Sequence, residues 1–492
     1  MASVDTSWYD VVEQKKGRAR QKLVKSDYFA SAISLEELGD VEIECIVPIV
    51  KMSYDIHTRA DEIVKTGEFA FPGEGVNRFA LRDVLPLAEL KAFETADAAY
   101  GIGTTVTLAS GDEVGSYLTF KGWLHPGATT TEVPEGNLAQ RLAAIPVARP
   151  GMTEDQLRQI CMDYMRLEVE APFKLEEDFT YHIESQHRDR KLLGGKVYGG
   201  LPYVSRGAGN LYRLAEICDP VTGVLDRNSD VFENIRYFGN ACSGAASMAW
   251  ARVVTSAYLG YTMFLSEANG FLPVGPYRYG RENVTVFLKK DPDGYNCRHI
   301  CDENGEQVMF ESYAQMKPAD GVGCCGHVRM NSAIPTVVRN ADGTINGEES
   351  YTLMREQVCY PTHPNHIRIA PDGSHYLAQG FVDVKYTFRD LFDTEYIPFT
   401  FAEFRDPSRV EPTRVRFAVE PEVKDRVLTC NYPISDVFIE VGGKRYAYRN
   451  MEFFRKEVKM SDMFPVELLT KETRVFCQLY NGEYLEVFWT EK

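Results

Sequence analysis

The stretch YFGNACSGAASMAW, residues 237–250, sets one cysteine among small side chains and then continues as an apolar segment. We expect a strand or loop to end at Ala241 and a helix to run from Cys242 to about Leu259. A helix N-terminus offers unpaired backbone N–H groups and the positive end of the helix dipole, and both stabilise a thiolate. Small side chains after the cysteine let this helix end approach a sheet closely. The stretch therefore predicts either an activated nucleophile or a buried structural thiol, and its partners must decide between them.

The candidate base is His327, which begins a predicted strand directly after the glycines of GVGCCGHVRM. A hairpin predicted at Asp342 and Gly343 returns the segment MREQV alongside this strand. Glu356 or Gln357 then lies near the imidazole, and strand alternation allows only one of them to face it. Either side chain would fix the tautomer and orientation of the ring, and Glu356 would also stabilise the charged imidazolium.

Three stretches resemble the NlpC-type bacterial cell-wall cysteine peptidases, which belong to the papain-like superfamily. They are YGGLPY at 198–203, NACSGAASMAW at 240–250 and KPADGVGCCGHV at 317–328. In that family a Gly/Pro-Tyr motif precedes the catalytic helix, a Cys-Ser-Gly motif opens the helix, and a Pro-Gly-Asp turn leads into a strand that carries Gly-His. The resemblance spans roughly residues 150–410. It implies Cys242 as the nucleophile, His327 as the base, and Glu356 or Gln357 as the third polar residue.

The resemblance also implies an activity, that of a thiol hydrolase that cleaves an amide or peptide bond through a cysteine thioester and needs no cofactor or metal. The implied substrate is a peptide or cell-wall fragment with a γ-D-glutamyl linkage. The backbone N–H of Cys242 and one further donor are expected to meet the oxyanion. The positions expected to contact substrate are Tyr203, Arg206, Ser243 and Gly326.

The chain departs from the family pattern in three places. Ala241 stands where the family often has Asp, and Ala319 replaces the usual Gly before Asp320. A segment of 38 residues separates Tyr203 from Cys242, which is long for a connection, so it is expected to form a lid or side wall. Within it, the sequence leaves open whether particular side chains contact substrate or only pack: Arg206, Tyr212 and Arg213.

The hydrophobic patterning predicts an α+β protein in which a papain-like hydrolase domain, a helix packed on an antiparallel sheet, is flanked by two small all-β modules. Residues 1–26 are expected to be helical or flexible, 27–150 to form a β-rich module, 151–411 the hydrolase domain and 412–492 a β-sandwich-like module. Thr153 is the expected N-cap of a helix with buried positions at Leu157, Ile160, Tyr164 and Leu167. The central segments expected to be strands are 282–290, 306–316, 326–340 and 351–360.

Composition narrows the function classes. The net charge of −17 argues against nucleic-acid binding, which requires clustered lysine and arginine. No run of about 18 apolar residues predicts a membrane span. The 11 cysteines are an odd number spread over the chain, unlike a disulfide framework. The start lacks the apolar core of a signal peptide, so we expect a cytoplasmic protein as written, or an extracytoplasmic one if a leader was removed. The sequence does not predict the oligomeric state.

Two alternatives remain open at this stage. The first is a zinc site, because cysteine and histidine suit this metal and five of them occur in two short stretches, although their spacing is not a common finger spacing. Those five residues are Cys297, His299, Cys301, Cys324 and Cys325, with His327 beside them. The second alternative is a non-catalytic protein whose β-modules bind a glycan or protein partner while the central domain is a degenerate enzyme. The remaining histidines of the central region, expected in loops or on the surface, are His363, His366 and His375.

Overall fold

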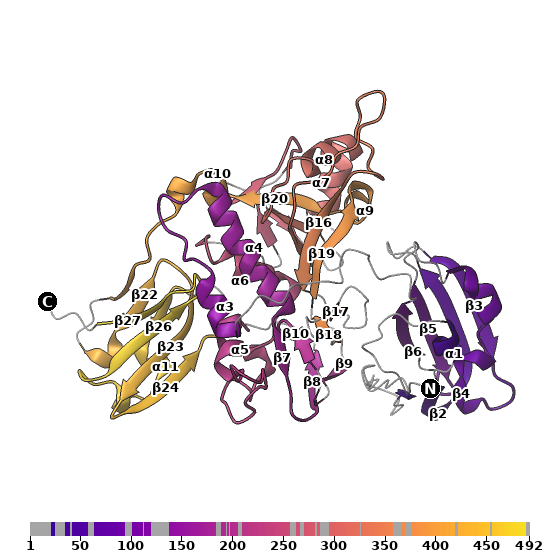
Figure 1. The fold of residues 1–492 in the computed structure, drawn as a ribbon, viewed down its shortest axis with the longest axis horizontal. Coiled ribbons are helices and arrows are strands. Elements are labelled where there is room, and N and C mark those ends of the chain that lie inside the picture. Colours follow the sequence, from indigo (N-terminus) through magenta and orange to yellow (C-terminus); the bar gives the residue numbers. More distant parts are fainter. Residues whose placement is uncertain are drawn as a thin grey trace.

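The fold is α+β with several antiparallel sheets, as predicted (Figure 1). No helix among the residues placed by the structure is long and apolar enough to cross a membrane. The computed structural model describes residues 21–24, 35–39, 42–57, 63–93, 101–111, 113–119, 137–183, 188–192, 194–195, 197–204, 209–255, 262–265, 270–280, 283–285, 295–324, 326–357, 367–369, 375–378, 380–418, 422–452 and 455–488.

An antiparallel sheet at the N-terminal side is built around one long strand, β2 (Glu42–His57), as expected for a β-rich module. It encloses its own apolar cluster, which includes Leu38 and Ile43. Figure 1 shows this sheet in indigo on the right. The other strands of the sheet are β1 (Gln21–Val24), β3 (Ile63–Ala70), β4 (Val76–Ala80), β5 (Gly101–Leu108) and β6 (Glu113–Thr119). The same region contains the short helices α1 (Leu35–Gly39) and α2 (Leu87–Leu90).

The central apolar cluster is organised by the helix α4 (Glu154–Glu170). Thr153 is its N-cap and accepts the backbone N–H of Gln156, which confirms the predicted helix start. The four positions predicted to be buried are all buried: Leu157, Ile160, Tyr164 and Leu167. The same cluster includes the short helix α3 (Leu138–Ala144) and residues up to Ala148, so it begins before residue 150.

A six-stranded antiparallel sheet packs beside this helix and carries the site. Its strands lie in the order β12 (Phe271–Pro273), β20 (Ile397–Phe401), β14 (Gly321–Cys324), β15 (His327–Asn331), β16 (Tyr351–Gln357) and β19 (Gly380–Thr387). The helix α6 (Cys242–Trp250) contacts β15, β16 and α4. The turn predicted at Asp342 and Gly343, between β15 and β16, forms, because the N–H of Gly343 donates to the carbonyl oxygen of Asn340 at 3.0 Å.

Two predictions of local structure are wrong. Residues 306–316 do not form a strand, since the helix α8 (Glu306–Tyr313) occupies most of them and buries Met309, Phe310 and Tyr313 at helical spacing. A short apolar run is compatible with either structure, and here the period decides. The helix that starts at Cys242 ends at Trp250 rather than near Leu259, because the β-branched Val253, Val254 and Thr255 follow as turn and loop.

Smaller elements complete the central region. A four-stranded sheet has the order β17 (Ile367–Ile369), β18 (His375–Ala378), β10 (Val197–Gly199) and β7 (Pro172–Lys174), with β10 and β18 parallel. Two pairs stand alone, β8 (Phe179–Ile183) with β9 (Arg188–Leu192) and β11 (Thr262–Phe264) with β13 (Asn283–Thr285). The remaining helices described here are α5 (Leu211–Ile217), α7 (Cys297–Asn304), α9 (Phe388–Asp393) and α10 (Ala402–Arg405).

The C-terminal module consists of two antiparallel sheets around a separate apolar cluster. The predicted hairpins at Gly442–Gly443 and Asn481–Gly482 are confirmed, because they connect β23 to β24 and β26 to β27. One sheet contains β21 (Val415–Phe417), β22 (Val427–Cys430) and β25 (Glu457–Lys459), and the other contains β24 (Lys444–Arg449), β23 (Ile434–Val441), β26 (Arg474–Leu479) and β27 (Tyr484–Val487), with α11 (Met460–Met463) beside them.

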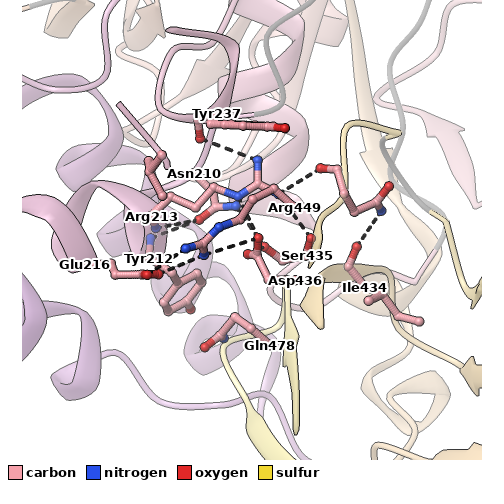
Figure 2. A network of polar contacts seen from close by, with 12 residues as sticks. Asn210, Tyr212, Arg213, Glu216, Tyr237, Ile434, Ser435, Asp436, Arg449 and Gln478 are labelled. Carbon is pink, nitrogen blue, oxygen red and sulfur yellow. Dashed lines mark hydrogen bonds and ion pairs between the residues drawn. The ribbon is translucent and has the colours of Figure 1, made fainter. Parts of the chain in front are cut away.

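A buried polar network joins this module to the central region (Figure 2). Arg213 of α5 is fully buried, and its Nε donates to Asp436 Oδ1 at 2.9 Å. It also donates to the carbonyl oxygens of Ser435 and Asn450. Arg449 of β24 pairs with Glu216 and Asp230 of the central region. Arg213 is therefore an anchor between the two regions, and the packing alternative left open by the sequence is the correct one.

A second candidate residue in the long segment before Cys242, Tyr212, also has a packing role. Tyr212 hydrogen-bonds the buried Arg252, so it supports the core rather than facing a ligand. Arg206, the third candidate in this segment, lies outside the described residues. This segment was predicted to form a lid or side wall. From residue 209 onward, it instead hydrogen-bonds the C-terminal module through Asn210 and Arg213.

Candidate active site

Cys242 is the first residue of α6, and its exposed fraction is only 9%. The residue before it, Ala241, has an extended backbone and provides no side-chain cap. The buried Asn240 instead accepts the N–H of Ala241 at 3.0 Å and donates to Glu168 Oε1 at 2.9 Å. Asn240 thus fixes the residue that precedes α6, and Cys242 lies at the N-terminal end of this helix.

The space around Gly244 explains why the Cys-Ser-Gly motif has a glycine at this position. A Cβ at Gly244 would lie 1.7 Å from Asn240 Oδ1, so any larger residue would displace the amide that braces this helix start. At Gly244, the small size that was predicted to allow close approach to a sheet is therefore required by the helix start itself. Ser243, a predicted substrate contact, is half-buried, and its backbone N–H hydrogen-bonds the sulfur of Cys242.

The backbone of Tyr203 pairs with the segment that leads into Cys242, despite the long connection between them. Residues 202–204 run next to residues 239–241, since the N–H of Val204 donates to the carbonyl oxygen of Asn240 at 2.9 Å. The N–H of Asn240 in turn donates to the carbonyl oxygen of Pro202 at 2.8 Å. Tyr203 and Asn240 form a parallel bridge, so the half-buried Tyr203 is paired with the residue two positions before Cys242.

His327 is the first residue of β15 and reaches Cys242 across the sheet edge. Its side chain hydrogen-bonds the Cys242 sulfur, and the carbonyl oxygen of the exposed Gly326 lies 4.0 Å from that sulfur. The ring Nε2 hydrogen-bonds Glu356 Oε2, so Nδ1 is the ring nitrogen left for the sulfur. The His327 side chain is 22% exposed, which leaves the pair reachable from solvent.

The register of β16 selects the third residue. Met330 pairs with Arg355, so the next pair along the strands sets Arg329 opposite Glu356 on the face that carries His327. Gln357 points the other way and donates from Nε2 to the carbonyl oxygen of Leu201 at 2.6 Å. Of the two residues left open by the sequence, only Glu356 contacts the imidazole.

The charges of these three groups support one another. Burial raises the pKa of the Cys242 thiol, but the charge and hydrogen bond of His327 and the N–H groups of Val328 and Ser243 outweigh it and bring the pKa below its ordinary value. Burial lowers the pKa of His327, yet Cys242 and Glu356 raise it to about 9. Burial likewise raises the pKa of Glu356, and Arg329, His327 and Tyr386 lower it to about 2. All three shifts favour a thiolate–imidazolium pair beside an ionised carboxylate.

The turn that leads into β14, the strand before the one that carries His327, holds a strained residue. Ala319, which replaces a glycine of the family pattern, has a φ of 69°, a left-handed conformation that is costly for a residue with a Cβ. Its carbonyl oxygen accepts the indole N–H of Trp250 at 2.9 Å, which ties the turn to the end of α6. The next residue, Asp320, is buried and pairs with Arg158 at 2.8 Å.

The described residues of the zinc hypothesis are not arranged to hold a metal. Cys297 and Cys301 lie one turn apart on α7, buried, while His299 is exposed on the same helix. No group of three histidine, cysteine or acidic side chains within the described ranges is arranged to hold a metal. Cys325, His363 and His366 lie outside those ranges, as does the side chain of His375.

Three residues of this site were not identified from the sequence. Arg329 donates to Glu356 Oε2 at 2.8 Å, and Tyr386 and Tyr396 pack on its guanidinium group. Alternation along β15 could have indicated Arg329, because a residue two positions after His327 faces the same side. Nothing in the local sequence indicates the two tyrosines, which come from β19 and from the residue before β20.

The comparisons with known proteins show no family. No family model and no curated protein matches the chain. Among solved structures, a β-glucuronidase from Parabacteroides merdae aligns at 9% identity and a TM-score of 0.13, covering the whole of this chain and 64% of its own. A red sea bream transglutaminase aligns at 8% identity and a TM-score of 0.10, covering 92% of this chain and 80% of its own. Both scores are too low to carry an argument about fold or function.

Proposed function

We propose that this protein is a thiol hydrolase that cleaves an amide or peptide bond through a thioester on Cys242. The observation that carries the proposal is the contact chain from Cys242 through His327 to Glu356, built on a helix start and two adjacent strands. A nucleophile, a base in hydrogen-bond contact with it and a third group that orients the base are the parts that acyl transfer requires.

The chemistry follows from the charges of the resting pair. The Cys242 thiolate attacks the carbonyl carbon, and His327 donates its proton to the leaving amine as the thioester forms. The neutral imidazole then takes a proton from water, whose oxygen attacks the thioester and releases the acid and the thiol. The N–H of Cys242 and one further donor stabilise the oxyanion, and a donor of this kind contributes about 3 kcal/mol to the transition state.

The substrate class comes from the resemblance to NlpC-type peptidases. A cysteine helix packed on an antiparallel sheet that carries the histidine supports a papain-like arrangement of the central region. We propose a γ-D-glutamyl peptide of the cell wall as the substrate. Ser243 and Gly326 lie next to the Cys242 sulfur, and the backbone of Tyr203 pairs with Asn240. We propose these three residues as substrate contacts, and Arg206 remains a predicted one.

The test compares the protein with Cys242→Ala on purified cell-wall fragments and short γ-glutamyl peptides, with products read by mass spectrometry. Cleavage by the first and none by the second is the expected result. Cys218→Ala is the matched control and should cleave normally. Cys218 takes no part in the contacts described for the site, and burial raises the pKa of its thiol to about 11. Equal products from all three proteins would reject hydrolysis of these substrates and favour the non-catalytic alternative.

A further inference from the structure

Arg329 lies in the middle of the site but has no place in the chemistry of Cys242, His327 and Glu356. Its Nε donates at 2.8 Å to Glu356 Oε2, the same oxygen that His327 Nε2 contacts. The Arg329 side chain is 14% exposed, and removing a cation from water is costly unless its partners compensate. A buried arginine that shares the carboxylate of the base is therefore a costly feature that a merely structural role does not require.

Two tyrosines fix this arginine and its partner. The guanidinium carbon of Arg329 lies 3.9 Å from the ring centre of Tyr386 and 4.2 Å from that of Tyr396. The hydroxyl of Tyr386 also donates to Glu356 Oε1 at 2.5 Å. Both carboxylate oxygens of Glu356 are thus engaged, so the carboxylate cannot rotate away from His327.

We propose that Arg329 is a positioning residue of this site, which fixes the Glu356 carboxylate and offsets its negative charge so that His327 holds a proton it can still release. The inference rests on the proposed function, because it assigns His327 the role of proton donor. Its consequence is electrostatic and is measurable without any substrate.

The titratable groups around His327 come from every element packed against it. They are Cys242 of α6, Arg329 of the same strand, Glu356 of β16, Tyr386 of β19, and Tyr396, which itself contacts Cys324 of β14. With the thiolate and carboxylate ionised, two negative groups face two positive ones. Loss of Arg329 leaves an excess negative charge, which holds the imidazole proton more tightly.

The size of the effect follows from the shared oxygen. Because Arg329 and His327 both hydrogen-bond Glu356 Oε2, their nitrogens lie within about 6 Å of each other. A charge at that distance in a partly buried site shifts a pKa by roughly one to two units. The pKa of His327, already raised to about 9 by its other neighbours, should rise further when a neutral residue replaces Arg329.

The experiment is an NMR titration of the His327 imidazole, assigned by the signal lost in His327→Gln. Arg329→Gln should move the titration midpoint upward by roughly one pH unit or more. Arg329→Lys keeps the charge while losing the planar stack, so its midpoint should stay near that of the unchanged protein. A midpoint in Arg329→Gln that is unchanged or lower overturns the inference.

A second comparison does not depend on the stability of Arg329→Gln. Glu356→Gln leaves Arg329 uncompensated beside the imidazole and should lower the midpoint. Adding Arg329→Gln to it replaces the ion pair by two neutral amides and should raise the midpoint again; equal midpoints in these two variants would also overturn the inference. Shifted titrations without hydrolysis count against the proposed function alone, whereas hydrolysis with unshifted titrations counts against the role of Arg329.

Discussion

At the scale of single residues, the thiol of Cys242 differs from the other described thiols in its partners rather than in its exposure. Cys161 is buried and the pKa of its thiol is raised by burial, and the partly exposed Cys218 also has a raised pKa. Only a thiol that meets an imidazole and backbone N–H groups gains enough to overcome the cost of burial. Reactivity should therefore follow electrostatics and not accessibility.

This difference predicts a pH profile. Iodoacetamide at pH 6 to 7 should alkylate Cys242 before Cys218, because the lowered pKa of Cys242 gives it a larger thiolate fraction than Cys218, whose pKa is raised to about 11. Hydrolysis needs the thiolate and the imidazolium together. It should decline as pH falls through the lowered pKa of Cys242 and decline again as pH rises through about 9, where His327 loses its proton. Peptide mapping after timed alkylation and kcat/KM against pH measure the two effects, and faster labelling of Cys218 would contradict the first.

At the scale of elements, the turn before β14 shows how the fold tolerates a residue with an unfavourable backbone conformation. Ala319 is left-handed because its carbonyl must meet Trp250 while Asp320 turns inward to Arg158. The contacts on both sides impose a backbone conformation that the residue itself disfavours.

Ala319→Gly should stabilise the protein, since glycine adopts this conformation without a Cβ penalty. We expect a gain of about 0.5–1 kcal/mol in the free energy of unfolding, reduced by the extra freedom of glycine in the unfolded chain. Ala314→Gly is the control, because Ala314 has an ordinary helical φ of −61° and the same change there should destabilise. Urea denaturation of both variants gives the comparison, and a loss of stability in Ala319→Gly would refute the assignment of strain.

Elements also mark how far the sequence alone could go. The residues Cys242 and His327 were predictable because a helix start and a strand start are local patterns. The selection of Glu356 over Gln357 was not, since it depends on the pairing of β15 with β16, which is a long-range property. Residues 306–316 were assigned to the wrong structure because a short apolar run does not distinguish a strand from a helix. The packing of Arg329 depends on two rings that are distant in the sequence, Tyr386 of β19 and Tyr396 just before β20.

At the scale of the whole molecule, the C-terminal module is attached through buried charges. Arg213 and Asp436 are both almost fully buried and lie in different regions of the chain. Breaking one partner of such a pair leaves the other uncompensated, which costs more than the pair itself contributes.

Asp436→Asn should therefore destabilise the protein by about 3–5 kcal/mol. The combined change Arg213→Met and Asp436→Leu should recover part of that loss, because no buried charge remains from this pair. Glu177→Gln is the control, since its pair with Arg227 is exposed and should contribute about 0–1 kcal/mol. Thermal unfolding measures all three, and an Asp436→Asn protein as stable as the control would show that the pair does not hold the module.

The contact between Gly482 and Arg252 has a consequence for biosynthesis. A Cβ at Gly482 would lie 2.0 Å from the guanidinium of Arg252, so this hairpin packs directly on a residue two positions after the end of α6. Tyr480 from the same hairpin is part of the central apolar cluster. A nascent chain therefore completes this support for the helix that begins with Cys242 only after residue 482 has left the ribosome, so α6 cannot reach its final packing before the hairpin of the C-terminal module has been synthesised.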